Sequence, residues 1–218
     1  MISSVYTPPL DPYLDILFED DSLLVLNKQS GLLSVPGRTD DRKDSLQLRA
    51  QDHTGGALTV HRLDMETSGV IVMAKSKDSH RALSRQFQDR KTDKDYVAVV
   101  AGRIEQDRGT IDLPMRCDWP NRPKQIIDHE LGKSAQTQYQ VVERHDDRTR
   151  VKLTPITGRS HQLRVHMLAL GHPILGDALY ATGEALAASK RLLLHAERLT
   201  ITHPVTEERC QFFAPVPF

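Results

Sequence analysis

Cysteines, long apolar runs and early basic residues are all scarce in this sequence of 218 residues. The two cysteines, Cys117 and Cys210, are too few and too far apart for a disulfide framework, which favours a reducing compartment. The longest stretch without a charged residue covers only residues 165–176, too short to cross a bilayer. No Lys or Arg precedes Lys28, so a signal peptide with its cationic start is not expected. These absences argue against a membrane protein and predict a cytoplasmic one.

The sequence also lacks the loops that hold common cofactors. There is no Gly-x-Gly-x-x-Gly, no phosphate-binding Gly-x-x-x-x-Gly-Lys-Ser/Thr and no Gly-x-Ser-x-Gly. Ten histidines invite a metal site, but no His-Glu-x-x-His occurs. His161 and His166 are five residues apart, about 140° around a helix, and so would not face one ion together. The sequence therefore predicts neither a metal nor a cofactor.

The charge balance is neutral, with 29 basic and 29 acidic residues, and 39% of residues are hydrophobic, which is typical of a folded globular chain. The distribution is uneven, because residues 1–27 carry five acids and no base. Residues 75–94 hold seven bases and three acids, and residues 144–164 hold six bases and two acids. Two basic stretches in a neutral chain are a weak indication of a polyanionic partner; solvated surfaces would explain them equally well.

Short β-branched and apolar runs alternate with a few helical patterns, which predicts an α+β fold with a mixed, largely antiparallel sheet flanked by helices and loops. No repeat or linker divides the chain, so residues 14–218 are expected to form one domain after an N-terminal extension, residues 1–13. Strands are predicted at 16–18, 23–26, 70–73, 96–100, 136–143, 150–153, 192–194, 199–201 and 211–213. Of these, 16–18 and 23–26 are expected to form a hairpin across the acidic turn 19–22, and 136–143 is expected to pair antiparallel with 150–153. Helices are predicted at 44–51, capped by Asp44 and ended by Gly55, at 76–90, capped by Ser76, and at 160–170, with Leu163, Met167 and Leu170 on one face. Residues 114–133 are predicted to be a loop.

The polar stretch at residues 61–69, His-Arg-Leu-Asp-Met-Glu-Thr-Ser-Gly, lies just before a buried strand. If this segment is extended, Asp64 and Glu66 share one face about 7 Å apart. Such a pair could cleave a glycosidic bond as acid and nucleophile. An Asp that caps a turn beside a solvated Glu explains the same residues, so spacing alone leaves both readings open.

Two further polar positions stand out against apolar surroundings. Arg164 lies on a helix otherwise lined with apolar residues, so it needs a carboxylate partner or a ligand phosphate, unless it extends outward to solvent. Tyr96 opens a strand, where a tyrosine is most often part of the core with its hydroxyl group at a partner. Neither position identifies a function by itself.

Taken together, the motifs resemble those of the RluA-type pseudouridine synthases, which modify structured RNA. The family pattern His-Arg-Leu-Asp-x-x-Thr-Ser-Gly matches residues 61–69, and Lys-x-Tyr-x-Ala-x-Val-x-Gly matches residues 94–102. Gly-Arg-Thr-His-Gln-Ile-Arg-Val-His and Gly-His-Pro-Ile-x-Gly-Asp are matched by residues 158–166 and 171–177, with Ser160 and Leu163 as mild changes. An early Asn-Lys-Pro-Ser-Gly is matched by residues 27–31, with Gln29 in place of the proline. The order of the four motifs is also that of the family.

The resemblance implies an isomerase that detaches uracil from ribose at N1 and rejoins it at C5, with no cofactor. It assigns Asp64 as the essential aspartate, acting as nucleophile or base. Arg164 corresponds to the cation that keeps this aspartate ionised. Tyr96 corresponds to the tyrosine that stacks on the target base.

The same resemblance implies an RNA partner, with stem-loops of 23S rRNA and the tRNA anticodon arm as the expected substrates. Arg62 would fill the space left by the flipped uridine, while Arg159 and His61 are also expected at the RNA. Many members carry an S4-like RNA-binding domain before the catalytic core, and none is expected here. The protein is expected to be a monomer. A non-catalytic RNA-binding chaperone remains the alternative from another class.

Overall fold

The computed structural model describes residues 5–218 and divides the chain into two compact units. Unit 1 contains the residues up to Asp93 together with Ala196–Val216, and unit 2 contains Lys94–His195 with Pro217–Phe218. The predicted N-terminal extension, residues 1–13, lies partly outside the described residues, and its residues 5–13 form no helix or strand. Among the described residues, no helix is both long enough and apolar enough to cross a membrane.

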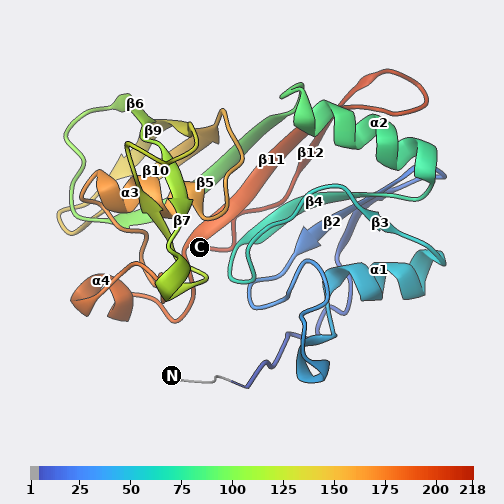
Figure 1. Cartoon of the computed structure of the whole chain (residues 1–218), viewed down its shortest axis with the longest axis horizontal. Coiled ribbons are helices and arrows are strands. Elements are labelled where there is room, and N and C mark those ends of the chain that lie inside the picture. The colour runs from blue at the N-terminus through green and yellow to red at the C-terminus, as the bar shows by residue number, and fades with distance from the viewer. Residues whose placement is uncertain (1–4) are drawn as a thin grey trace. The chain divides into compact units, whose positions relative to one another are not determined.

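Unit 1 is built on a sheet in the order β1-β2-β4-β11, with β3 paired to β4 and β12 paired to β11 (Figure 1). The β1–β2, β2–β4, β3–β4 and β11–β12 pairs are antiparallel. The predicted hairpin is confirmed, since Phe18 pairs with Val25 across an acidic turn. Helix α2 packs against β3 and β4. The elements of this unit are β1 (Ile16–Glu19), β2 (Leu23–Lys28), α1 (Leu46–Thr54), β3 (Leu58–Thr59), β4 (Ser68–Ala74), α2 (Lys77–Gln88), most of β11 (Leu194–Thr202) and β12 (Arg209–Phe213).

A serine side chain caps the N-terminus of each of the two α-helices of unit 1, α1 and α2. Ser76 accepts a hydrogen bond from the N–H of Ser79, which confirms the predicted start of α2. Helix α1 begins one residue later than predicted, because Ser45 is its cap and Asp44 pairs with the buried Arg49 instead. Its end at Gly55, in a left-handed conformation, is as predicted.

Strand β4 is buried along its whole length, so its sequence has to be apolar or small on both faces. Gly69 shows how closely the next strand approaches. Its φ angle is +115°, and a Cβ atom at this position would lie 2.2 Å from the carbonyl oxygen of Ala196. Only glycine fits there, which explains the glycine that ends the 61–69 motif.

Unit 2 contains an antiparallel sheet in the order β5-β10-β9-β6 and a separate hairpin of β7 and β8. The predicted pairing of residues 136–143 with 150–153 is confirmed by β9 and β10. The elements of this unit are β5 (Asp93–Ala101, whose first residue belongs to unit 1), β6 (Arg108–Asp112), β7 (Met115–Cys117), β8 (Gln125–Ile127), β9 (Gln136–Arg144), β10 (Arg148–Pro155), α3 (Gln162–Ala169) and α4 (Gly183–Ala187).

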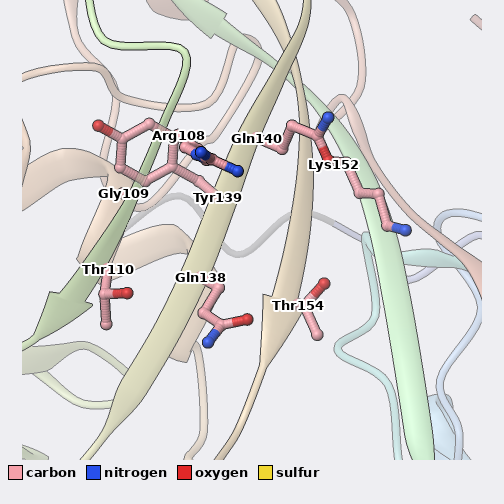
Figure 2. A pocket seen from close by; sticks show the side chains of 8 residues that line it. All are labelled: Arg108, Gly109, Thr110, Gln138, Tyr139, Gln140, Lys152 and Thr154. Atoms are coloured by element: carbon pink, nitrogen blue, oxygen red, sulfur yellow. The ribbon is translucent and has the colours of Figure 1, made fainter.

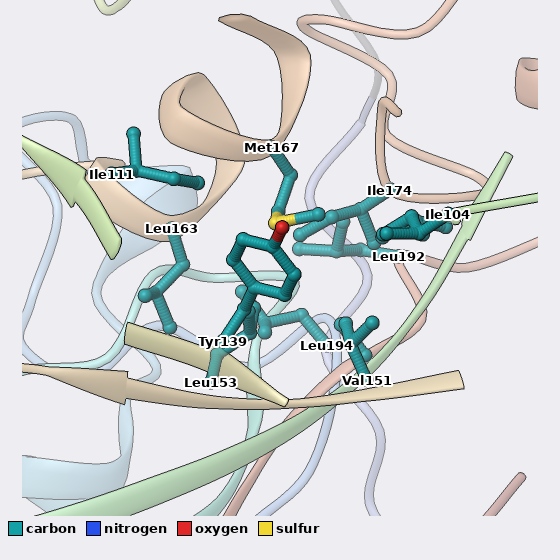
Figure 3. Close-up of a cluster of buried hydrophobic side chains, with 12 residues drawn as sticks. Ile104, Ile111, Tyr139, Val151, Leu153, Leu163, Met167, Ile174, Leu192 and Leu194 are labelled. Carbon is teal, nitrogen blue, oxygen red and sulfur yellow. The ribbon is translucent and has the colours of Figure 1, made fainter. Parts of the chain in front are cut away.

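Helix α3 provides one side of the unit 2 core. Figure 3 shows Leu163 and Met167 pointing from the helix toward Tyr139 and Leu153 on the strands. Burial of such a set of aliphatic and aromatic side chains is the main stabilising contribution to a unit of this size. The prediction that Leu170 lies on the same inner face is wrong, because the helix ends at Ala169 and 37% of Leu170 is exposed.

Three other sequence-based predictions need correction. Residues 114–133 are not simply a loop: they contain the hairpin β7–β8, with a short 3-10 helix at Trp119–Asn121 between its strands. Of the strand predicted at 192–194 only Leu194 lies in a strand, because β11 begins there and runs without a break through the predicted strand 199–201 to Thr202. Strand β6 and helix α4 were not predicted, since neither has a strong apolar period.

Candidate active site

The six predicted site residues fall three in each unit. Unit 1 carries His61, Arg62 and Asp64 in the loop between β3 and β4. Here the chain turns, with the N–H of Thr67 donating to the carbonyl oxygen of Asp64 at 3.1 Å. The segment is therefore not extended, and Asp64 and Glu66 do not have the strand spacing that a paired-carboxylate site was expected to use.

The loop of residues 60–67, which carries Asp64, is hydrogen-bonded to residues 28–34. Lys28 is fully buried, and its ammonium donates to the carbonyl oxygens of Gln29 at 2.8 Å, Leu32 at 2.6 Å and Met65 at 2.8 Å. The Ser34 hydroxyl accepts from the N–H of Leu63 at 3.1 Å and donates to its carbonyl oxygen at 2.7 Å. These bonds fix the main chain on both sides of Asp64, which explains why the 27–31 motif accompanies the 61–69 motif.

Replacing Lys28 by Met is expected to lower the free energy of unfolding by about 2–3 kcal/mol, because three carbonyl oxygens would lose a charged donor inside the protein. Urea denaturation would measure the loss. Lys43→Met is the matched control, since this exposed lysine donates only to two carbonyl oxygens at 3.4 Å. Equal stability of the two variants would show that the buried ammonium contributes nothing.

His61 is integrated into unit 1 on both of its sides. Its ring stacks on Phe87 of α2 with 4.4 Å between centroids, and its Nε2 accepts from the N–H of Val72 at 3.1 Å. Arg62, the next residue, is exposed, and Asp64 is half-buried. Along this loop, the packed side chains of His61 and Leu63 therefore alternate with the more accessible side chains of Arg62 and Asp64.

Tyr96 lies on β5 of unit 2, opposite Leu153 of β10, and packs against the core cluster of this unit. Its neighbour Asp95 points to the other face, where it is buried and accepts from the Thr154 hydroxyl at 2.7 Å and the Lys152 ammonium at 2.9 Å. Burial lowers the pKa of Lys94, the lysine that begins the Lys-x-Tyr motif. The motif therefore combines a core tyrosine with two charged groups that are largely removed from water.

Arg164 has the carboxylate partner that its position on α3 requires. Its Nε donates to Asp177 Oδ2 at 2.8 Å and its Nη2 to Asp177 Oδ1 at 2.6 Å, a bidentate pair in which both side chains are almost fully buried. The guanidinium also lies 5.1 Å from the ring centroid of Tyr180. Asp177 further accepts from the N–H groups of Leu179 and Tyr180. The arginine is thereby fixed in one orientation.

The segment before α3 is organised by Gln162. Its Oε1 accepts from the Thr157 hydroxyl at 2.6 Å and the N–H of Arg159 at 3.0 Å, while its Nε2 donates to the carbonyl oxygen of Gln136. Arg159 itself is exposed, and its Nε donates to the carbonyl oxygen of Ser134 at 3.1 Å. Gln162 therefore holds the loop that presents Arg159 to solvent.

On the same helix, burial lowers the pKa of His166, which lies between the Thr137 hydroxyl and the carbonyl oxygen of Leu113. This histidine fits a neutral ring that joins α3 to its neighbours. No group of three His, Cys, Asp or Glu side chains within residues 5–218 is arranged to hold a metal ion.

Four residues that support the site were not singled out from the sequence: Lys28, Ser34, Gln162 and Asp177. Lys28, Gln162 and Asp177 each lie inside a recognised motif, so the motifs themselves were the available signal. Ser34 lies outside the motifs, and only the three-dimensional structure reveals its bond to the loop.

Unit 2 also contains a cavity of about 340 Å³ (Figure 2). It lies over the sheet face formed by alternate residues such as Lys152 and Thr154 of β10, whereas Tyr96 and Leu153 face the core. Its lining consists of Arg108, Gly109, Thr110, Gln138, Tyr139, Gln140, Lys152 and Thr154. None of the six predicted site residues lines this cavity, so we assign it no role in the reaction.

Comparison with known proteins identifies the family. The model of the RNA pseudouridylate synthase family matches residues 22–169. The chain is 59% identical to the dual-specificity RNA pseudouridine synthase RluA of Escherichia coli, over 98% of both chains, and 55% identical to that of Haemophilus influenzae, also over 98% of both.

Solved structures of RNA pseudouridylate synthases have the same fold. Human RNA pseudouridylate synthase domain containing 1 superposes with a TM-score of 0.79 at 31% identity, covering all of this chain and 87% of the human one. Human RNA pseudouridylate synthase domain containing 4 superposes with a TM-score of 0.73 at 29% identity, covering 93% of this chain and 88% of the human one. The predicted fold class is thereby confirmed. The chain therefore belongs to the RNA pseudouridylate synthases, the isomerases that convert uridine in RNA to pseudouridine.

Proposed function

We propose that this enzyme has two kinds of substrate, stem-loops of 23S ribosomal RNA and the anticodon stem-loop of tRNA. The observation that carries the proposal is its 59% identity, over nearly the whole of both chains, to a relative named a dual-specificity RNA pseudouridine synthase. Two basic stretches, residues 75–94 and 144–164, support it by supplying charge for phosphate contacts.

In the proposed reaction, the N1–C1′ bond of a uridine breaks, the uracil rotates, and a C5–C1′ bond forms. The C5 hydrogen leaves as a proton and N1 gains a proton, so atoms balance and no oxidant or reductant is needed. Asp64 acts as the nucleophile or base of this reaction. Its position on a turn fixed by Lys28 and Ser34 would keep the carboxylate from moving during the reaction.

Tyr96 and Arg164 are the other proposed catalytic residues. Tyr96 stacks on the target base, for which a planar ring anchored in a sheet is well suited. Arg164 supplies the positive charge that favours an ionised carboxylate at the reacting centre. The bidentate bond to Asp177 makes Asp177 a positioning residue for this guanidinium.

A uridine within folded RNA has to be flipped out before it can react. Arg62 is proposed to fill the vacated stack, because it is exposed and its planar guanidinium can stack on neighbouring bases. Arg159, also exposed, is proposed to contact phosphates. His61 is proposed to contribute at the substrate through the loop that it holds in place.

We further propose that the protein acts as a cytoplasmic monomer and that residues 14–218 work as one catalytic domain. The family model supports the last point, because residues 22–169 include parts of both units. Size-exclusion chromatography with light scattering would test the monomer.

Release of tritium from RNA labelled at uracil C5 tests the function, because isomerisation expels that hydrogen whereas binding or glycosidic hydrolysis does not. We expect release from both a 23S rRNA stem-loop transcript and a tRNA anticodon stem-loop transcript. Release from only one of them would reduce the proposal to a single substrate. An absence of release from both, despite tight binding, would contradict the substrates proposed here.

A further inference from the structure

The only tryptophan of the chain, Trp119, lies at the tip of the β7–β8 hairpin with 65% of its surface exposed. An indole ring usually contributes its large apolar area to a core or an interface, so its exposure here is unusual. The neighbouring tip residues are polar apart from Pro120 and Pro123, and the indole is the one large apolar side chain of residues 118–124. A small, isolated aromatic surface is suited to a single flat ligand group rather than to a protein interface, which needs a larger apolar centre.

The charge around the ring indicates the kind of ligand. The Arg122 guanidinium lies 4.7 Å from the ring centroid of Trp119, and Lys124 is exposed two residues further along. Residues 119–125 contain these two bases and no acid. An aromatic face next to cations is the combination that binds single-stranded nucleic acid, since bases stack on the ring while the cations contact the phosphates.

The tip is held rigidly from within. Asp118 donates its N–H to the carbonyl oxygen of Lys124 at 2.9 Å, and its carboxylate accepts from the Asn121 amide at 2.9 Å. The N–H of Gln125 donates to the Tyr180 hydroxyl at 2.8 Å, which ties β8 to the residue that lies against Arg164. A platform that is already ordered loses little entropy when a ligand binds.

The base of the hairpin is equally well fixed. Asp128 accepts from the N–H of Leu131, the Arg116 guanidinium and the N–H of Glu130, which together lower the pKa of Asp128 to about 2. This carboxylate is therefore ionised at every pH at which the protein would be assayed. It pairs with Arg116, and the charged groups of the tip are then the bases Arg122 and Lys124 together with the Asp118 carboxylate, which accepts from Asn121.

We propose that the tip of the β7–β8 hairpin is a stacking platform on which Trp119, supported by Arg122, binds an unpaired base of the substrate RNA outside the target uridine. The inference rests on the proposed function, because it assumes that a stem-loop RNA is the substrate. It assigns to the hairpin a contact with loop nucleotides, which stem-loops present unstacked and accessible.

The test uses Asp64→Asn protein, so that binding is measured without turnover, and the tRNA anticodon and 23S rRNA stem-loop transcripts as probes. Because Trp119 is the only tryptophan, quenching of its emission reports on stacking directly. We expect saturable quenching at the Kd given by filter binding. We further expect Trp119→Ala to raise this Kd about tenfold, the loss of one base–aromatic stack, and Trp119→Phe to restore most of it.

Two variants separate stacking from charge and from general effects on the hairpin. Arg122→Ala is expected to reduce the slope of log Kd against log salt by about 0.7, whereas Trp119→Ala leaves the slope unchanged. Leu131→Ala, which removes another exposed apolar side chain of the same segment, is the matched control and should bind as the parent does.

RNA binding without a change in tryptophan emission, or equal Kd values for Trp119→Ala and its parent, would overturn the platform. If tritium release by the wild-type enzyme is intact in that case, the proposed function stands and only the platform fails. If no variant binds either RNA and no tritium is released, both are wrong.

Discussion

Asp64→Asn is expected to reduce tritium release from C5-labelled RNA by at least about a thousandfold, because the amide can act neither as nucleophile nor as base. The variant should fold normally. Asparagine has nearly the same size, and the turn at this position is made by main-chain atoms, with Thr67 N–H donating to the carbonyl oxygen of residue 64. Single-turnover release measured with excess enzyme would isolate the chemical step from product release.

RNA binding by Asp64→Asn is expected to stay close to that of the wild-type protein, which a filter-binding titration would check. Glu66→Gln is the control, because its side chain only accepts a 3.4 Å hydrogen bond from Ser30 and a glutamine oxygen can replace that acceptor. Full activity of Glu66→Gln would exclude a hydrolase pair. Full function of Asp64→Asn would instead support the non-catalytic RNA-binding alternative.

Patterns in the sequence predicted much of the local structure, because turns, helix caps and helix ends are determined by residues that lie close together in the chain. The β1–β2 hairpin, the cap at Ser76 and the end of α1 at Gly55 are examples. The cap at Ser45 was missed because Asp44 is an equally good capping residue by type. What decided between them was the partner Arg49, which takes both oxygens of Asp44.

The supporting parts of the site could not be predicted in the same way, since they depend on contacts between distant segments. Nothing near Lys28 in sequence indicates that its ammonium meets the carbonyl oxygen of Met65, 37 residues later. The need of Arg164 for a partner was predicted, but its identity was not. Several carboxylates were available, and the fold of the segment after α3 selects Asp177.

These supporting contacts share one feature: polar side chains bond to the backbone or to the charge of a proposed catalytic residue and stay out of solvent themselves. Lys28 and Ser34 act on the loop of Asp64, while Gln162 and Asp177 act on the segment of Arg159 and Arg164. Such second-layer contacts limit the movement of reacting groups to the fraction of an ångström that catalysis requires. Their loss should therefore affect stability as well as rate.

The clearest case is Asp177→Ala, which is expected to lower the free energy of unfolding by about 3–5 kcal/mol. The substitution removes the carboxylate that accepts two hydrogen bonds from the buried Arg164 guanidinium, and it also leaves the N–H groups of Leu179 and Tyr180 without this acceptor. Urea denaturation would measure the change. Asp78→Ala is the control, since it breaks an exposed pair with Arg81 and should cost no more than about 0.5 kcal/mol.

A double variant separates the structural role of the Arg164–Asp177 pair from its catalytic role. Replacing both residues by apolar ones, Arg164→Met with Asp177→Leu, removes the buried charges together and is expected to recover most of the stability that Asp177→Ala loses. Tritium release should stay undetectable, because the proposed cation at the reacting centre is absent. Recovery of both stability and activity would mean that Arg164 only supports the fold, and the proposed chemistry would then have to rely on another cation.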